Sequence, residues 1–360
     1  MRGRAKKIIL AALLGSMVYN IFSDDHLLRA DFSPEIGAAS AVVMFEDGSC
    51  VYEKNADERR LIASTTKLMT ALVAIELSEP EQPIEIPAEC CGIEGSSMYL
   101  APGEILTADE LLAGLLLASG NDAAEALAVS LCGSEESFVT LMNEKAAALG
   151  LHDTAFANPH GLDDAGQFST ARDLARLMFA CMDDERFARL VALPSAEIDG
   201  KNYVNHNKLL GRCEGCVGGK TGYTRAAGRC LVSCCEREGT RFVCVTLSDP
   251  DDWNDHMRLY DAAFASWSNR LAVSGDERYA IAVAGGTEEF AFAAPESELR
   301  LFMPRDEELE YVREMPRFTY APVRSGACAG RIVVLRGGEA AGEVKLIYIR
   351  GIPRRGEKTG

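Results

Sequence analysis

Basic residues are scarce in this chain of 360 residues, and the shortage limits the partners that it can bind. Lysine and arginine number 37 against 54 aspartates and glutamates, which gives a formal net charge of −17. Nucleic-acid binding depends on a cationic surface that neutralises phosphates, so this composition argues against DNA or RNA as a partner. No internal repeat is evident either.

The chain also lacks a hydrophobic run long enough for a typical membrane-spanning helix, which needs about 20 apolar residues. Its N-terminal apolar stretch, residues 8–22, directly follows a cationic cluster at residues 2–7. This order is typical of a secretory signal, so residues 1–28 are predicted to be a signal peptide or an N-terminal anchor. A clean small-x-small cleavage site is missing near Ser23, so both forms stay open. Either form predicts an exported protein at the cell wall or the membrane surface.

Ser64 and Lys67 open a run, residues 64–77, whose apolar pattern predicts a buried helix. Residues three apart lie on the same face of a helix, so the serine hydroxyl can meet the lysine amine. A serine becomes a nucleophile when a base takes its proton, and burial beside a second cation keeps a lysine partly uncharged. The structural alternative is that Ser64 caps the helix and Lys67 is a solvated first-turn residue.

Ser119 and Asn121 lie on a short Ser-Gly-Asn connector between two apolar helices. The first helix is predicted over residues 107–118, where Thr107 and Glu110 fit a capping box, and the second starts at residue 123. In a catalytic interpretation, Ser119 would relay a proton to a leaving amine and Asn121 would hold the substrate amide and the lysine. In a structural interpretation, the segment only ends one helix and turns the chain.

Lys220, Thr221 and Gly222 precede two strands predicted over residues 228–235 and 241–248, and are expected on a neighbouring edge strand. A glycine within a strand often marks the close approach of another backbone. A peptide lying along this edge could pair as an added strand, with its terminal carboxylate held by Lys220 and Thr221. A second Lys-Thr-Gly, residues 358–360, follows no strand pattern and is interpreted as chance.

In this order, the three segments resemble those of the penicillin-recognising serine acyltransferases. The surrounding sequence is similar to that of the D-alanyl-D-alanine carboxypeptidases among the low-molecular-mass penicillin-binding proteins, over roughly residues 35–350. The segments that carry this resemblance are residues 62–71, 118–124, 156–163, 168–175, 205–210 and 218–224.

The resemblance implies an exported enzyme that removes the terminal D-alanine from peptidoglycan stem peptides and is acylated by β-lactam antibiotics. Ser64 would be the nucleophile and Lys67 the general base. The backbone N–H groups of Ser64 and Tyr223 would form the oxyanion hole. The full catalytic set implied is Ser64, Lys67, Ser119 and Asn121, and the substrate-binding set is Lys220, Thr221, Gly222 and Tyr223. No metal ion or other cofactor is implied.

Two alternatives assign the chain a different function. A β-lactamase or an esterase could use the same scaffold, and so could a non-catalytic peptidoglycan-binding or sensor protein. Class A β-lactamases carry a deacylating glutamate in an E-x-x-L-N segment. No such segment lies between Asn121 and Lys220, which predicts slow release of β-lactam adducts. An intact nucleophile and base argue against a purely binding role.

The pattern of elements and the resemblance agree on an α+β fold. Residues 29–271 are predicted to form a β-lactamase-like transpeptidase domain, with an antiparallel sheet, helices on its faces and a helical subdomain. Residues 272–352 are predicted to form a small all-β domain, and residues 353–360 a basic tail. The remaining strands are expected at residues 39–45, 50–53, 279–284, 289–293, 299–303, 331–335 and 344–349, and a closing helix at residues 253–267.

The 12 cysteines leave several interpretations open. Cys181, Cys230 and Cys244 lie in apolar runs and are predicted to be small core residues. The pair Cys213 and Cys216, followed by Cys230 and Cys234, is faintly similar to a zinc ribbon, although the spacing is irregular. A disulfide or a redox role for Cys213 and Cys216 is the alternative.

His160 is the one histidine in a suggestive setting, between Pro159 and Gly161. A role as base is one interpretation. A turn residue in a loop beside the site is favoured, because Lys67 already fills the position of the base.

Overall fold

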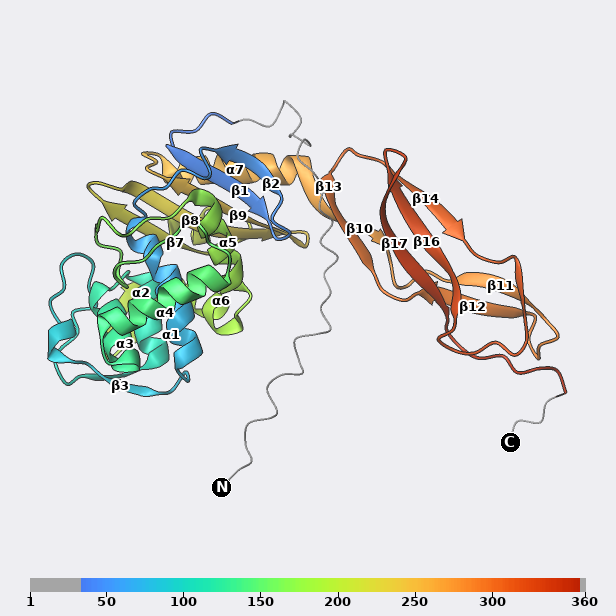
Figure 1. Cartoon of the computed structure of the whole chain (residues 1–360), viewed down its shortest axis with the longest axis horizontal. Coiled ribbons are helices and arrows are strands. Elements are labelled where there is room, and N and C mark those ends of the chain that lie inside the picture. The colour runs from blue at the N-terminus through green and yellow to red at the C-terminus, as the bar shows by residue number, and fades with distance from the viewer. Residues whose placement is uncertain (1–33, 357–360) are drawn as a thin grey trace, which may run out of the picture. The chain divides into compact units, whose positions relative to one another are not determined.

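The structure, a computed structural model, describes residues 34–356. The predicted signal peptide or anchor and the second Lys-Thr-Gly lie outside the described residues. Two regions are distinguished below: the α+β region, residues 34–266, and the β region, residues 267–356 (Figure 1).

The α+β region contains both helices and strands, whereas the β region contains only strands among the elements described. The helices are α1 (Lys67–Leu77), α2 (Ala108–Leu117), α3 (Asn121–Cys132), α4 (Glu135–Ala148), α5 (Ala171–Met182), α6 (Glu185–Val191) and α7 (Asp252–Ser266), with short 3₁₀ helices η1 (Ala63–Thr66), η2 (Ala88–Cys90) and η3 (Lys208–Gly211). The strands of the α+β region are β1 (Ser40–Phe45), β2 (Cys50–Lys54), β3 (Pro83–Glu85), β4 (Ile105–Thr107), β5 (Ser195–Ile198), β6 (Lys201–Val204), β7 (Cys216–Thr224), β8 (Gly228–Arg237) and β9 (Thr240–Leu247).

A five-stranded antiparallel sheet, in the order β2-β1-β9-β8-β7, forms the frame of the α+β region. Strands β8 and β9 meet at a two-residue turn, Glu238 and Gly239, whose φ angles are 52° and 70°. Two successive positive φ angles are what a tight hairpin turn requires. Strand β7, which carries Lys220, Thr221 and Gly222, lies at the edge of this sheet, as predicted.

The two faces of the sheet pack against different helices, because alternate residues of a strand point to opposite sides. On β9, Val243 and Val245 belong to the main hydrophobic core, while Thr246 faces α7 and contacts His256. Figure 1 shows α7 on one side of the sheet and α5, with the other helices, on the other side. This is the predicted antiparallel sheet with helices on both faces.

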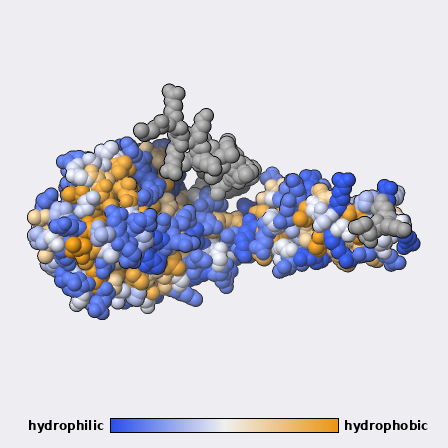
Figure 2. All heavy atoms as spheres, turned by 90° about the horizontal axis from the view of Figure 1, so that it is seen from below, coloured by the Kyte–Doolittle hydropathy of each residue, from blue (hydrophilic) through white to orange (hydrophobic). Residues whose placement is uncertain are grey.

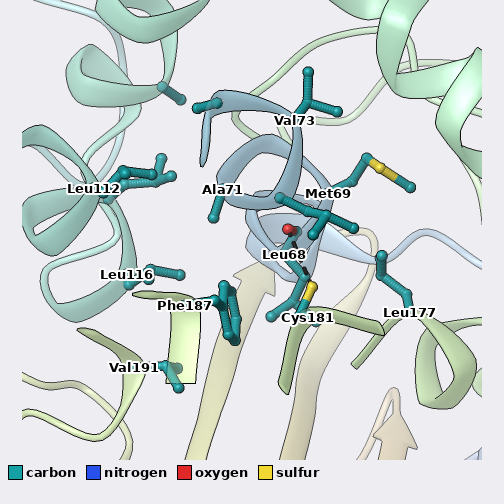
Figure 3. Close-up of a cluster of buried hydrophobic side chains, with 14 of the residues drawn as sticks. Leu68, Met69, Ala71, Val73, Leu112, Leu116, Leu177, Cys181, Phe187 and Val191 are labelled. Carbon is teal, nitrogen blue, oxygen red and sulfur yellow. Dashed lines mark hydrogen bonds between the residues drawn. The ribbon is translucent and has the colours of Figure 1, made fainter. Parts of the chain in front are cut away.

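Helix α1 is the centre of the helical layer and packs against α2, α3, α4, α5 and α6. All its residues from Lys67 to Ile75 are buried, as expected for a helix that is apolar on nearly every side. Figure 3 shows Leu68, Met69 and Ala71 surrounded by side chains of the neighbouring helices. Cys181 is wholly buried there and its thiol donates to the backbone of Leu68, so its predicted core position is confirmed.

The β region contains a six-stranded sheet and a separate strand pair. The sheet has the order β14-β16-β17-β12-β11-β15, and the pair is β10-β13. Its strands are β10 (Trp267–Val273), β11 (Tyr279–Ala284), β12 (Phe290–Pro295), β13 (Leu299–Pro304), β14 (Leu309–Glu314), β15 (Phe318–Tyr320), β16 (Cys328–Arg336) and β17 (Glu339–Tyr348). The predicted strands are present, but residue 267 begins β10 instead of ending the closing helix. Strands β10, β14 and β15 were not predicted. Five of the six residues of β14 are exposed and give no hydrophobic alternation.

The observed architecture confirms the predicted α+β class with an all-β C-terminal part. Hydrophobic residues are scattered among hydrophilic ones on the face shown in Figure 2. Exposed large side chains such as Tyr99 and Tyr223 are 82% and 69% accessible. Within residues 34–356, none of the helices combines the length and the hydrophobicity that crossing a membrane requires.

Candidate active site

Ser64 lies in η1, one turn before α1, and is half-buried between neighbours that are fully buried. The backbone around it is tightly enclosed by two glycines from distant segments. A Cβ on Gly222 would lie 3.0 Å from the Ser64 nitrogen, and a Cβ on Gly161 would lie 2.1 Å from the carbonyl oxygen of Ala63. Ala63 itself has a φ of 47°, which is uncommon for a residue with a side chain. The close approach predicted for Gly222 is therefore confirmed, and the approaching backbone is that of Ser64.

Lys67 is completely buried, and its amine has three polar neighbours. Its Nζ is 3.0 Å from Ser64 Oγ and 2.7 Å from Asn121 Oδ1, and it also donates to the carbonyl oxygen of His160. Burial, reinforced by the charge of Lys220, lowers the pKa of this amine well below its usual value. The interpretation of Lys67 as a solvated residue is thus wrong.

Ser119 and Lys220 meet although they are 101 residues apart in the chain, because the α2–α3 connector lies beside β7. The Lys220 amine donates to Ser119 Oγ at 3.0 Å and to the carbonyl oxygen of Thr221 at 2.9 Å. Lys220 is 1% exposed, and burial lowers its pKa to about 7. Ser119 has a φ of 62°, which is strained for a residue with a side chain.

Asn121 is the first residue of α3, two residues earlier than predicted, and it joins Lys67 to the loop at residues 94–100. Its Nδ2 donates to Glu94 O at 2.5 Å, which leaves Oδ1 to accept from the Lys67 amine. The preceding glycine is the N-cap and has no side chain, so the helix starts at Asn121 without a side-chain cap. Because Nδ2 is bound to Glu94 O, the amide has one orientation, with Oδ1 toward the Lys67 amine.

Asp122 holds the same loop, a role that no sequence pattern predicted. Its Oδ1 accepts from the backbone N–H groups of Met98 and Ala123, both at 2.9 Å, and its Oδ2 accepts from Ser97 Oγ at 2.6 Å and Leu100 N at 3.1 Å. The carboxylate is wholly buried. It therefore fixes the loop that orients its neighbour in the sequence.

His160 also contributes in a way that the sequence did not predict, since it is the backbone carbonyl and not the ring that accepts from Lys67. The ring Nδ1 accepts from Leu162 N at 3.2 Å, and burial together with the charge of Lys67 lowers the pKa of the imidazole to about 4. The loop is fastened to β7 by Thr224, whose hydroxyl donates to Asp163 at 2.7 Å. The prediction that His160 lies in a loop beside the site is thus confirmed.

The remaining predicted site residues follow Lys220 along β7. Thr221 is half-buried, Gly222 is buried against Ser64, and Tyr223 is exposed. The structure thus brings Ser64, Lys67 and Asn121 into one hydrogen-bonded group and Ser119 and Lys220 into a second. A surface hollow of about 560 Å³, at the other end of α1, contains none of these residues.

Two other clusters bear on metal binding. Within residues 34–356, one set of side chains, Glu125, Glu135 and His160, has possible ligand atoms within 4.8 Å of one another. The zinc-ribbon interpretation of Cys213, Cys216, Cys230 and Cys234 is wrong, because these four sulfurs form no such group among the described residues. Cys230 and Cys244 are wholly buried in the core, as predicted.

Comparison with known proteins extends this description. The sequence model of the D-alanyl-D-alanine carboxypeptidase family matches residues 29–251. The D-alanyl-D-alanine carboxypeptidase DacF of Bacillus subtilis is 31% identical over 324 residues, which cover 85% of this chain and 83% of that protein. The D-alanyl-D-alanine carboxypeptidase DacA of Escherichia coli is 30% identical over 343 residues, or 89% of this chain and 85% of that protein.

Solved structures show the same similarity. Penicillin binding protein 6B from Escherichia coli superimposes with a TM-score of 0.71 at 25% identity, covering 90% of this chain and 100% of that one. A D-alanyl-D-alanine carboxypeptidase from Mycobacterium tuberculosis gives a TM-score of 0.63 at 34% identity, covering 66% of this chain and 96% of that one.

Proposed function

The chain belongs to the D-alanyl-D-alanine carboxypeptidase family as a serine-type peptidase, and from this premise we propose that its reaction passes through an ester on Ser64. The substrate class is the peptidoglycan stem peptide that ends in D-alanyl-D-alanine. The proposal assigns a role to each member of the two hydrogen-bonded groups described above.

The set of partners around the Lys67 amine is the observation that carries this proposal. Asn121 Oδ1 and His160 O can only accept, so each takes one N–H of the amine. A neutral amine has two N–H groups and one lone pair, so the lone pair is left for the Ser64 hydroxyl, 3.0 Å away. Burial favours this neutral form. Lys67 is therefore arranged to take the proton as Ser64 Oγ attacks.

The reaction then follows from these positions. Ser64 Oγ attacks the carbonyl carbon of the penultimate D-alanine, and the oxyanion is held by the N–H groups of Ser64 and Tyr223. The leaving D-alanine takes its proton through Lys67 and Ser119. Water then hydrolyses the ester and releases the shortened peptide. Asn121 holds the substrate amide as well as the lysine.

Lys220 and Thr221 would bind the terminal carboxylate of the substrate. The Lys220 amine is buried and has a pKa of about 7, so a bound carboxylate would favour its charged form. Gly222 keeps β7 close to Ser64, because a side chain there would push the two segments apart. The peptide would lie along the free edge of β7, as an added strand.

We extend the proposal to the organisation and location of the protein. Residues 29–271 would form the catalytic domain, residues 272–352 an accessory β domain and residues 353–360 a basic tail. Residues 1–28 would direct export, so that the enzyme meets peptidoglycan outside the cytoplasm. The support is the cationic and apolar pattern at the N-terminus and the cell-wall role of the family.

A fluorescent penicillin tests the proposed nucleophile. Wild-type protein should become labelled in a one-to-one ratio, and Ser64→Ala should abolish the label because the acyl acceptor is gone. Ser134→Ala removes the half-buried serine that caps α4, outside the proposed site, and should leave labelling of the folded protein intact. Stoichiometric labelling of folded Ser64→Ala protein would overturn the assignment. Rapid turnover of penicillin by the wild type would instead favour a β-lactamase.

A further inference from the structure

Three thiols gather at the start of β7, apart from the hydrogen-bonded groups that contain Ser64 and Lys220. Cys213 lies in the turn before the strand, Cys216 is its first residue, and Cys235 is paired with Cys216 on the neighbouring strand β8. The sulfurs of Cys213 and Cys235 are 3.7 Å apart. The proposed carboxypeptidase reaction uses none of them.

The two thiols differ in access and in charge: Cys213 is 7% exposed and Cys235 is fully buried, so a small disulfide meets Cys213 first. Arg237 Nη2 lies 3.9 Å from the Cys213 sulfur. A hydrogen bond from Cys235, together with the charge of Arg237, lowers the pKa of Cys213 to about 7, whereas burial raises that of Cys235. Cys213 is therefore partly a thiolate at neutral pH, and the thiolate is the form that attacks a disulfide.

We propose that Cys213 and Cys235 form a reversible disulfide by exchange with a low-molecular-mass disulfide. The Cys213 thiolate attacks one sulfur of that reagent, forms a mixed disulfide and releases one small thiolate. Cys235 then gives its proton to the released thiolate and attacks the Cys213 sulfur, which expels the second small thiolate. Two protein sulfurs are oxidised, and the reagent is reduced to two thiols.

A disulfide fits the cluster better than a metal ion does. Tetrahedral zinc needs four ligands around one point. Among the residues that the structure describes, the three sulfurs of Cys213, Cys216 and Cys235 do not form a group with all atoms within 4.8 Å of one another. Cys235 lies between the other two thiols: its sulfur is 3.7 Å from that of Cys213, and it also interacts with Cys216, whose sulfur is 3.9 Å from Asn207 Nδ2.

The bond would join the turn before β7 to β8 and so fix the end of the strand that carries Lys220. Cys213 and Cys235 are 22 residues apart in the chain. A cross-link across such a segment restricts the unfolded chain and thereby stabilises the folded one. The oxidised protein should therefore melt at a higher temperature than the reduced protein.

Peptide mapping of the full chain tests the proposal. The reduced protein is incubated with oxidised glutathione, its remaining free thiols are alkylated, and the digest is analysed by mass spectrometry. Cleavage after Glu214 separates Cys213 from Cys216, so the two pairings with Cys235 can be distinguished. We expect a peptide that links Cys213 to Cys235, lighter than the two free peptides by two hydrogen atoms and released by dithiothreitol.

Matched variants sharpen the result. Cys213→Ser should abolish the link, whereas Cys216→Ser removes the neighbouring thiol and should leave both the link and the rise in melting temperature. A link through Cys216, or alkylation of both Cys213 and Cys235 after oxidation, overturns the proposal. So does a stoichiometric zinc ion that protects the thiols. The mapping of wild-type protein does not depend on whether a variant folds.

Discussion

The α+β region and the β region fill their interiors with different kinds of side chain. Buried polar and charged side chains occur throughout the first, from Ser40 to His256, and none of those found in residues 34–356 lies in the second. The interior of the β region is apolar, with Val334 and Leu346 wholly buried. Its ion pairs, such as Arg331 with Glu314, are exposed.

The α+β region therefore bears the free-energy cost of burying the polar groups of the proposed site. Burying an amine or a carboxylate is unfavourable unless the group is paired or neutral. Lys67 and Lys220 are both wholly buried, and both have lowered pKa values for that reason. Some buried polar groups are structural instead. His256 contacts Ser233 and Thr246 and joins α7 to β8 and β9.

Removing the Lys67 amine should give the largest effect. In Lys67→Met the acylation rate by penicillin should fall by about a hundred- to ten-thousand-fold, because the general base is lost. The melting temperature is measured beside it, because Asn121 Oδ1 and the His160 carbonyl lose their donor while the cost of burying an amine is removed. Lys345→Met, the same change at an exposed lysine of β17, should alter neither quantity. A Lys67→Met protein with the wild-type rate would remove Lys67 from the mechanism.

Loss of the Asp122 carboxylate should come next. Asp122→Ala leaves the buried N–H groups of Met98, Leu100 and Ala123 without their acceptor. The free energy of unfolding should fall by roughly 3 kcal/mol or more, measured by urea denaturation. Hydrogen exchange should quicken at residues 98–100. Unchanged exchange there would contradict the assigned role.

A core substitution in the β region should lower the free energy of unfolding without changing the acylation rate. Val334 is wholly buried in its apolar cluster, and Val334→Ala should lower the free energy of unfolding by about 2 kcal/mol. The acylation rate of the folded protein should be unchanged, because no residue of the proposed site lies in this region. A slower rate would show that the two regions are coupled.

The pH dependence of stability should report the burial of Lys220. Lys220 has a pKa of about 7 in the folded protein and about 10.5 when unfolded, so the unfolded chain binds more protons between these values. Stability should therefore rise with pH across that window, by about 1.4 kcal/mol per unit for this group. Lys220→Met should lose this contribution, which urea unfolding at pH 7 and pH 9 would detect. Parallel slopes for the two proteins would contradict the buried, neutral amine.

Local patterns were sufficient to predict much of the site. The spacing of Ser64 and Lys67 fixes their meeting, because both belong to one helical segment. The capping box of Thr107 and Glu110 is present as predicted, and it locates α2 and hence Ser119. Strand β7 was expected at the sheet edge from the hairpin that follows it.

Contacts between groups far apart in the sequence could not be predicted from local patterns. The carbonyl of His160 accepts from Lys67 across 93 residues, and no side-chain pattern reports the direction of a carbonyl. Likewise the register between β7 and β8 places Cys235, and not Cys234, opposite Cys216, and the turn before β7 brings Cys213 to the same sulfur. A shift of one residue would have exposed a different thiol.

The proposed mechanism depends most on an uncharged Lys67 amine beside the Ser64 hydroxyl, and the pH dependence of acylation measures the charge of that amine directly. The second-order rate constant for penicillin acylation of Ser64 should reach its alkaline plateau well below pH 10.5, the ordinary pKa of a lysine. A rate constant that still rises about tenfold per pH unit up to pH 10 would show an ordinary, charged lysine and contradict the account.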